Sequence, residues 1–234
     1  MNLRPFDKIL LSLSGGKDSQ AMLTMVHGLA TTQAVGDRLT AIHIDTGGEW
    51  PESLPHCEAL TAAFAVPLTI IHPNRPIPQE VAKRGKWPAA ACRFCTANCK
   101  RDAYEKFIRS LPQSKLLHIT GERKEESRHR AYLPELATEE RIHTRLRHVT
   151  RWRPMLPFTE QDIWAIINGS GLPHHAAYDY GCARVSCALC VLAPEHDLRI
   201  GAEHNPERAE SYLKLERDMN HNFTVRKRLS SILA

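Results

Sequence analysis

The sequence predicts an α/β fold, a doubly wound parallel sheet followed by a cysteine-bearing loop and a helical tail. Three observations support this prediction. Short apolar runs alternate with segments of helical periodicity, which is typical of a parallel sheet with helices on both faces. A glycine-rich loop at residues 14–19 separates the first apolar run from the first helical segment. Hydrophobic residues make up 42% and charged residues 24% of the 234 residues, which excludes a disordered, collagen-like or coiled-coil architecture.

The apolar runs and their spacing place the main elements along the chain. Buried strands are predicted at residues 8–13, 39–45, 67–71 and 116–120. Helices are predicted at 20–30, at 53–65 and after Thr159, and the charged stretch 206–234 is predicted to form one or two surface helices. Thr159 and Asp162 have the spacing of a capping box at the third of these helices. The cysteine-bearing stretches 86–101 and 174–194 are rich in small residues, so we expect loops there.

Composition also bounds the domain organisation and the compartment. We expect one domain over residues 1–194 and a helical extension over 195–234. No stretch approaches the about 20 apolar residues of a membrane span, and the first residues lack the pattern of a signal peptide. A cytoplasmic protein is therefore expected. The net charge of +5 suits a polyanionic partner, but many proteins without such a partner carry the same charge.

The glycine-rich loop Ser14-Gly15-Gly16-Lys17-Asp18-Ser19 has the composition of a phosphate cradle. Glycines let the backbone approach an anion, and the N-terminus of the following helix attracts negative charge. Lys17 adds a positive charge, and Ser14 and Ser19 add hydroxyl donors. The spacing differs from GxxxxGK[ST], so this is not the cradle of an ordinary P-loop NTPase.

Six of the seven cysteines form two clusters, which predicts metal or redox chemistry. The first cluster is Cys92, Cys95 and Cys99, and the second is Cys182, Cys187 and Cys190. Disulfides are disfavoured in a reducing compartment, whereas four thiolates suit zinc or an iron–sulfur cluster. Cys57 stands apart in a predicted helix, where a structural role is expected.

SGGKDS resembles the PP-loop of the ATP pyrophosphatase superfamily, and further strings resemble its phosphoadenosine phosphosulfate (PAPS) reductase branch. These strings occur in collinear order between about residues 8 and 194: Asp45-Thr-Gly-Gly-Glu-Trp-Pro-Glu52, Cys95-Thr-Ala-Asn-Cys-Lys100, Gly121-Glu-Arg-Lys-Glu-Glu-Ser-Arg128, Arg153-Pro-Met-Leu156 with Thr159–Trp164, and His175–Cys190. The resemblance implies an adenine nucleotide α-hydrolase-like fold. It also implies ATP cleavage between the α- and β-phosphates, with adenylation of an acceptor oxygen.

The resemblance assigns roles to particular residues. Lys17, Asp18 and Arg123 are the expected catalytic residues. ATP is expected to contact Ser14, Gly15, Gly16, Lys17, Asp18, Ser19, Asp45, Gly121 and Arg128. Mg²⁺ would be bound by Asp18 and Asp45, since a hard cation prefers carboxylates. Two alternatives stay open: Asp18 caps the helix, or Arg123 and Arg128 form salt bridges with Glu122, Glu125 or Glu126.

The same resemblance selects a metal-ligand set. Cys95 falls in the branch's CT…K position and joins Cys182, Cys187 and Cys190, to hold a 4Fe–4S cluster or Zn²⁺. Cys92 and Cys99 stay open as ligands.

Two departures from the reductases shape the functional prediction. The loop is intact, which favours ATP cleavage, and no cysteine follows Cys190, whereas thioredoxin-dependent PAPS reductases carry a C-terminal catalytic cysteine. The spaced cysteines resemble those of the ATP pyrophosphatase of bacterial DNA phosphorothioation. This resemblance implies a cysteine desulfurase as partner and DNA as acceptor. It leaves open whether the protein forms a homodimer. The alternatives are a PAPS or adenylylsulfate reductase, a non-catalytic metal-bound nucleotide or DNA sensor, and a tRNA-thiolating enzyme.

A basic strip could follow a nucleic-acid backbone, or it could be a solvated face. It consists of Arg141, Arg145, Arg147, Arg151 and Arg153, interleaved with His143, His148 and Trp152. His174 and His175 precede the second cysteine cluster, and a hydrogen-bonded structural role is the more common one for such histidines.

Overall fold

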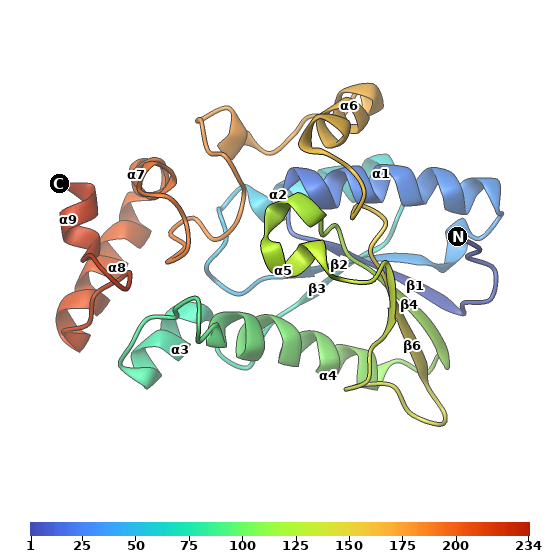
Figure 1. Cartoon of the computed structure of the whole chain (residues 1–234), viewed down its shortest axis with the longest axis horizontal. Helices are drawn as coiled ribbons and strands as arrows, with labels where there is room; N and C mark the ends of the chain where they lie inside the picture. The colour runs from blue at the N-terminus through green and yellow to red at the C-terminus, as the bar shows by residue number, and fades with distance from the viewer. The chain divides into compact units, whose positions relative to one another are not determined.

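A six-stranded sheet forms the centre of the computed structural model, which describes residues 1–234 (Figure 1). Its strands, in the spatial order β3-β2-β1-β4-β6-β5, are β1 (Lys8–Leu13), β2 (Leu39–Ile44), β3 (Leu68–Ile71), β4 (Lys115–Ile119), β5 (Leu136–Thr138) and β6 (His148–Trp152). The helices are α1 (Lys17–Thr32), α2 (Ser53–Ala63), α3 (Ile77–Arg84), α4 (Asp102–Ser110), α5 (Arg128–Ala131), α6 (Glu160–Ser170), α7 (Glu195–His204), α8 (Pro206–Met219) and α9 (Leu229–Leu233).

Strand pairing confirms the predicted doubly wound parallel sheet. β1 pairs in parallel with β2 on one side and with β4 on the other, and β4 pairs in parallel with β6. Only the edge strand β5 runs antiparallel to its neighbour. The direction in which strands are added reverses between β1 and β4, and ligands of such sheets bind beyond the carboxyl ends of the strands at this switch point.

Alternate side chains of β1 point to opposite faces of the sheet, and each face is covered by different helices. Ile9, Leu11 and Leu13 are buried against α1 and α6, whose residues Val26 and Ile163 belong to the same core cluster. In Figure 1, α1 and α6 lie over one face of the sheet and α4 lies along the other. The even-numbered residues of β1 therefore face the α4 side, as the two-residue period of a strand requires.

The chain folds into two compact units built from interleaved segments. Residues 1–43, 53–70 and 105–175 form the first unit, which contains most of the sheet and the glycine loop. Residues 44–52, 71–104 and 176–234 form the second, which contains both cysteine clusters. The predicted extension 195–234 belongs wholly to the second unit, together with residues 176–194.

The predicted elements occur, and others were missed. The four predicted strands and three of the predicted helices form within a few residues of the expected bounds. The expectation of a loop throughout 86–101 was wrong, because Cys95–Arg101 forms a π-helix that runs directly into α4. The stretch 206–234 contains two helices, α8 and α9, as predicted, and α7 precedes it.

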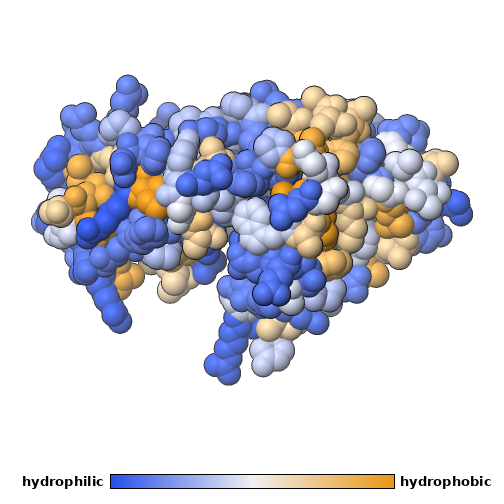
Figure 2. All heavy atoms as spheres, turned by 90° about the horizontal axis from the view of Figure 1, so that it is seen from above, coloured by the Kyte–Doolittle hydropathy of each residue, from blue (hydrophilic) through white to orange (hydrophobic).

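The exposed surface is predominantly polar. In the view of Figure 2, hydrophobic residues appear as separate patches among hydrophilic ones. The exposed large hydrophobic residues, such as Tyr132, Leu146 and Val225, come from distant parts of the sequence. None of the helices combines the length and the apolar composition that a membrane crossing requires.

We expect Thr159→Ala to lower the free energy of unfolding by about 1 kcal/mol, the usual cost of losing an N-cap side chain. The capping box predicted for α6 is present: Thr159 accepts a hydrogen bond from the Asp162 amide, and the Asp162 carboxylate accepts one from the Thr159 amide at 2.8 Å. Urea denaturation measures the change. Gln161→Ala, at an exposed position of the same helix, is the control, and an equal loss in both variants would contradict the prediction.

Candidate functional site

The glycine loop joins β1 to α1 at the switch point of the sheet. Gly15 has φ +81°, a left-handed conformation that side-chain-bearing residues rarely adopt. A Cβ at this position would also lie 3.3 Å from the ring of His175. Gly16 is the N-cap of α1 and offers no side chain for capping, so the partial positive charge of the helix N-terminus faces the loop uncapped. This geometry suits an anion.

Ser14 and Ser19 hold the loop in shape. The Ser19 hydroxyl donates to the Gly16 carbonyl at 2.8 Å and accepts from the Ser14 amide at 3.2 Å. Both serines therefore lie in the loop as predicted, and their hydroxyls already have partners within it. The two serines would therefore contribute to anion binding mainly by holding the loop backbone in the conformation that receives the anion.

Lys17 is almost completely buried, with 4% of its side chain exposed, and carboxylates surround its ammonium group. Its Nζ lies 3.3 Å from Glu160 at the start of α6 and 3.9 Å from Asp18. The side chain of Glu160 is 53% exposed. The buried cation is thus held by a carboxylate that can move into solvent.

Arg123 forms the second cation of the loop and resolves two alternatives left open by the sequence. Its Nε donates to the Asp18 carboxylate, and its Nη1 donates to Glu125 at 2.7 Å. Burial opposes its charge, but Asp18, Glu160 and Glu125 raise the pKa of Arg123 above its usual value. Asp18 is therefore an ion-pair partner of Arg123, and Arg123 does form salt bridges, with Glu125 among the three glutamates considered.

Gly121 lets the end of β4 approach the first turn of α1. A Cβ at Gly121 would lie 2.7 Å from the Asp18 carbonyl oxygen and 3.0 Å from the Ser19 amide nitrogen, closer than real side chains come. Glycine is required here for space, so the prediction that Gly121 belongs to the nucleotide site is consistent with its position against the loop. Arg128, by contrast, is exposed at the start of α5.

Two neutral imidazoles lie behind Gly15. His175 is 1% exposed, its Nε2 lies 3.1 Å from the Ser53 hydroxyl, and its ring centroid lies 5.5 Å from that of His56. Burial lowers the pKa of both histidines to about 4. The two imidazole rings next to Gly15 are therefore uncharged at neutral pH and add no positive charge to the loop.

Asp45, predicted as a nucleotide and Mg²⁺ ligand, belongs to the second unit, whereas Asp18 belongs to the first. Its carboxylate accepts a hydrogen bond from the Gly47 amide at 2.9 Å and lies 3.7 Å from His72 Nδ1. Its own surroundings do not form a cation site.

Three thiols of the second unit act on one another electrostatically. Cys190 raises the pKa of Cys95, and both Cys190 and Cys95 raise that of Cys187. Burial is the largest cause and brings the pKa of Cys187 to about 12, against the opposing effect of Lys100. Cys95, Cys187 and Cys190, which come from two distant segments, therefore lie within electrostatic range of one another.

Glu49 and Lys100 lie beside these thiols and were missed as site residues. Lys100 Nζ lies 3.5 Å from Glu49, whose carboxylate also accepts hydrogen bonds from Thr46 at 2.7 and 2.9 Å. The backbone at Glu49 forms a bridge with Cys187. Burial opposes the Lys100 charge, but Cys187 and Glu49 raise the pKa of Lys100 overall. Lys100 therefore provides a permanent positive charge next to the thiols.

The fourth predicted ligand, Cys182, does not join this group. It is 5% exposed and packs in a separate apolar cluster with Trp50 and Ile200. Burial and the nearby Asp197 raise the pKa of its thiol to about 11. No group of three or more His, Cys, Asp or Glu side chains is arranged to hold a metal ion. The thiols have suitable chemistry for a metal, but Cys182 packs apart from the other three predicted ligands in this structure.

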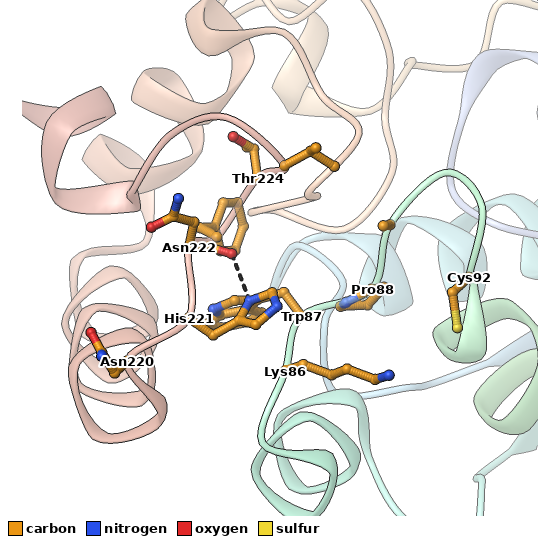
Figure 3. Close-up of a pocket in the computed structure, with 11 residues that line it drawn as sticks. Lys86, Trp87, Pro88, Cys92, Asn220, His221, Asn222 and Thr224 are labelled. Atoms are coloured by element: carbon orange, nitrogen blue, oxygen red, sulfur yellow. Dashed lines mark hydrogen bonds between the residues drawn. The ribbon is translucent and has the colours of Figure 1, made fainter.

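The two cysteines left open have different surroundings. Cys99 is buried and its thiol donates to the Arg75 carbonyl oxygen at 3.6 Å, which is a structural contact. Cys92 is exposed and lines a cavity of about 480 Å³ in the second unit (Figure 3). Trp87 and Phe223, with ring centroids 4.8 Å apart, form part of the same cavity wall.

Most of the arginines in the basic strip have partners within the first unit. Arg141 pairs with Glu105 at 2.5 Å, Arg151 with Glu139 at 3.0 Å and Arg153 with Glu122 at 2.7 Å. Arg147 donates to the Leu111 carbonyl at 2.9 Å. These contacts favour the structural interpretation of the strip over a nucleic-acid contact.

Fold and loop together define an α/β protein of the PP-loop, adenine nucleotide α-hydrolase type, with a nucleotide-binding fold. The chain belongs to the phosphoadenosine phosphosulfate reductase domain family, whose model matches residues 8–193. The predicted resemblance to this branch, from about residue 8 to 194, is thereby confirmed.

The relatives include proteins of differing names. An uncharacterised protein of Methanocaldococcus jannaschii is 28% identical over 184 residues, which is 78% of this chain and 36% of the relative. A phosphoadenosine 5'-phosphosulfate reductase of Gloeobacter violaceus is 26% identical over 82% of this chain and 74% of its own length. The chain therefore spans about a third of the archaeal relative and about three quarters of the reductase.

Solved structures share the fold at low sequence identity. A PAPS reductase of Candida auris in a phosphate complex matches with a TM-score of 0.57 at 17% identity, over 79% of this chain and 83% of the other. Candida glabrata FMN adenylyltransferase in complex with ATP gives 0.57 at 17% identity over 77% and 53%. The U34-tRNA thiolase NcsA of Methanococcus maripaludis with its [4Fe-4S] cluster gives 0.55 at 15% identity over 96% and 79%.

We expect Glu160→Gln to tighten the binding of inorganic pyrophosphate about 2- to 5-fold, because an anion no longer competes with a carboxylate for Lys17. This range corresponds to the about 0.5–1 kcal/mol typical of a half-exposed ion pair. Isothermal titration calorimetry measures the dissociation constant.

Glu140→Gln is the matched control, since it removes one negative charge from an exposed position of the same unit. Weaker binding by Glu160→Gln, or equal tightening in both variants, would contradict the competition between Glu160 and the anion.

Proposed function

We propose that this protein is an ATP pyrophosphatase that cleaves ATP to AMP and pyrophosphate and adenylates an acceptor oxygen for replacement by sulfur. The observation that carries the proposal is the pair of buried cations at the N-terminus of α1. Lys17 and Arg123 are each about 4% exposed, and both are held by carboxylates that are about half exposed, Glu160 and Glu125. The two exposed carboxylates can move into solvent, and the phosphates of a nucleotide can then bind Lys17 and Arg123 in their place.

Each loop residue has a role in this reaction. The uncapped helix N-terminus and Gly15 receive the phosphates, and Lys17 stabilises the charge that develops on the leaving pyrophosphate. Arg123 contacts phosphate oxygens in the same way, and Asp18 positions Arg123 through their ion pair. Mg²⁺ would accompany ATP as its counter-ion, with Asp18 of the loop the carboxylate proposed to bind it.

Known neighbours support ATP as the substrate. The solved FMN adenylyltransferase of this fold holds ATP, and another of its structures holds FAD and inorganic pyrophosphate. An adenylyl transfer with pyrophosphate as leaving group is therefore chemistry that the fold accommodates.

The sulfur step is proposed to take place at Cys95, Cys187 and Cys190, with Lys100 favouring their thiolate forms. The thiolase among the solved neighbours is named with a 4Fe–4S cluster, and a cluster or Zn²⁺ bound by thiols of this unit is part of the proposal. A DNA backbone phosphate, as in phosphorothioation, is the acceptor that we propose, and a cysteine desulfurase is the sulfur donor. The ion-paired arginines 141, 151 and 153 do not contribute to DNA binding in this scheme.

A sulfonucleotide reductase is the second candidate, because relatives from three bacteria bear that name, at 23–31% identity. Such an enzyme would release sulfite from PAPS or adenylylsulfate, and it would not form AMP and pyrophosphate from ATP.

We expect the anaerobically purified protein to convert ATP and Mg²⁺ to AMP and pyrophosphate, and Lys17→Ala to lower this activity at least about 100-fold, through loss of a charge directed at the leaving group. Chromatography of the nucleotides and a pyrophosphate assay measure the products. Lys115→Ala, at an exposed position of the same unit, is the control.

AMP formation that survives Lys17→Ala unchanged would contradict the proposal. Absence of AMP with DNA and a desulfurase added, together with sulfite release from PAPS, would establish the reductase instead.

Metal analysis tests the thiol site. We expect iron and sulfide, or zinc, in the anaerobically purified protein, with the metal lost in Cys187→Ser and kept in Cys182→Ser, because only Cys187 lies with the other thiols. Cys57→Ser is a further control from the first unit. Loss of metal from Cys182→Ser would show that Cys182 is a ligand after all, as the sequence predicted. A wild-type protein that contains no metal would contradict the proposed metal site.

A further inference from the structure

A serine, a histidine and a glutamate of the first unit form a continuous hydrogen-bonded chain outside the glycine loop. The Ser12 hydroxyl lies 2.8 Å from His118 Nε2, and His118 Nδ1 lies 2.5 Å from the Glu139 carboxylate. Ser12 is on β1 and His118 on the adjacent strand β4, where Leu10 is the register partner of His118. Ser12 therefore lies one pleat further along the same face of the sheet.

The protonation states in this chain follow from its geometry and charges. Burial would raise the pKa of Glu139, but the His118 hydrogen bond and the Arg151 guanidinium at 3.0 Å lower it to about 2. Glu139 is therefore an anion at neutral pH, and it must accept its hydrogen bond from a protonated Nδ1. Burial lowers the pKa of His118, so its ring is neutral and Nε2 accepts the hydroxyl proton of Ser12.

Ser12 is more exposed than the histidine that it contacts. Ser12 is half-buried, whereas His118 is 4% exposed. Ser12 is the penultimate residue of β1, near the edge of the sheet where ligands of parallel sheets bind. Hydroxyl, imidazole and orienting carboxylate thus have the hydrogen-bonded arrangement of an activated nucleophile, and the hydroxyl belongs to the more exposed residue of the pair.

We propose that Ser12 is a nucleophilic serine, activated by His118 and Glu139, that cleaves small carboxylic esters or thioesters. Ser12 Oγ attacks the carbonyl carbon while its proton passes to His118 Nε2. The bond from the carbonyl carbon to the leaving oxygen or sulfur then breaks, and the leaving group takes the proton as an alcohol or thiol. Water attacks the acyl-serine by the same route, which releases the carboxylic acid and restores Ser12.

Glu139 orients and stabilises the imidazole and does not contact the substrate. It is a positioning residue in this reaction, and Arg151 in turn holds its carboxylate. This activity needs neither ATP nor the cysteines, so it is separate from the proposed pyrophosphatase.

Covalent labelling tests the proposal directly. The full-length protein is treated with a fluorophosphonate probe, which reacts with activated serines, and the labelled peptide is identified by mass spectrometry. We expect a single labelled residue, Ser12, in the wild-type protein, a result that requires no variant to fold. Ser12→Ala should lose the label, and Lys17→Ala should keep it.

Hydrolysis of p-nitrophenyl acetate gives the matching rate measurement. We expect Ser12→Ala to abolish the activity and His118→Gln to lower it about 100-fold or more, the usual contribution of a general base. Glu139→Gln should lower kcat with little change in KM, which a merely structural role would not do. Ser170→Ala is the matched control, since Ser170 is also half-buried and its hydroxyl bonds only to backbone groups, those of Ile167 and Leu172 at the end of α6.

Absence of labelling in the wild-type protein, labelling at another residue, or hydrolysis that persists in Ser12→Ala would overturn the proposal. None of these outcomes depends on the fate of ATP, so failure here and failure of the pyrophosphatase are separate results.

Discussion

The ion pair between Asp18 and Arg123 is the contact on which the first unit's site depends, because it joins the first turn of α1 to the segment that follows β4. The contact forms only because Gly121 brings that segment against the Asp18 backbone with no side chain between them. Arg123 then fills the position beside Lys17, and two cations come to lie at a helix N-terminus that already carries a partial positive charge. Such a concentration of positive charge would be unfavourable on its own. Glu125 and Glu160 compensate for it while no anion is bound.

This compensation gives a physical reason for the selectivity that the site would show. A weakly charged anion cannot displace carboxylates that already satisfy Lys17 and Arg123, whereas a triphosphate with Mg²⁺ supplies several oxygens at once. Surface ion pairs contribute little to stability, so releasing Glu160 into solvent costs about 1 kcal/mol or less. The exposed carboxylates thus neutralise the site, while its two cations are already buried and positioned before an anion binds. Preorganised charge of this kind is what electrostatic catalysis requires.

The sequence was most informative where a local pattern determines the structure. The strands at 8–13 and 116–120 and the loop at 14–19 could be predicted because apolar runs and glycines act locally. β6 was missed because its arginines find carboxylates from other segments, Arg151 with Glu139 for example, so an internal strand has the charge pattern of a surface. The same limit applies to the site. Glu160 and Lys100 meet their partners only in the folded chain, although Lys100 lies in the CT…K string and Glu160 in the first turn of a predicted helix. Cys182 shows the converse error, since proximity to a CxxC in sequence did not bring it to those thiols.

β4 contributes residues to both of the proposed chemistries. Its buried residues Leu117 and Ile119 point into the core shared with α1, and His118 points to the opposite face, where it meets Ser12 and Glu139. Beyond the end of the strand, Gly121 and Arg123 complete the glycine loop. Because alternate residues of a strand face opposite sides, His118 does not belong to the face of β4 that packs against α1, and Arg123 lies beyond the end of the strand. The two proposed sites therefore consist of separate residues, so that each proposed activity can be tested by variants that do not alter the residues of the other.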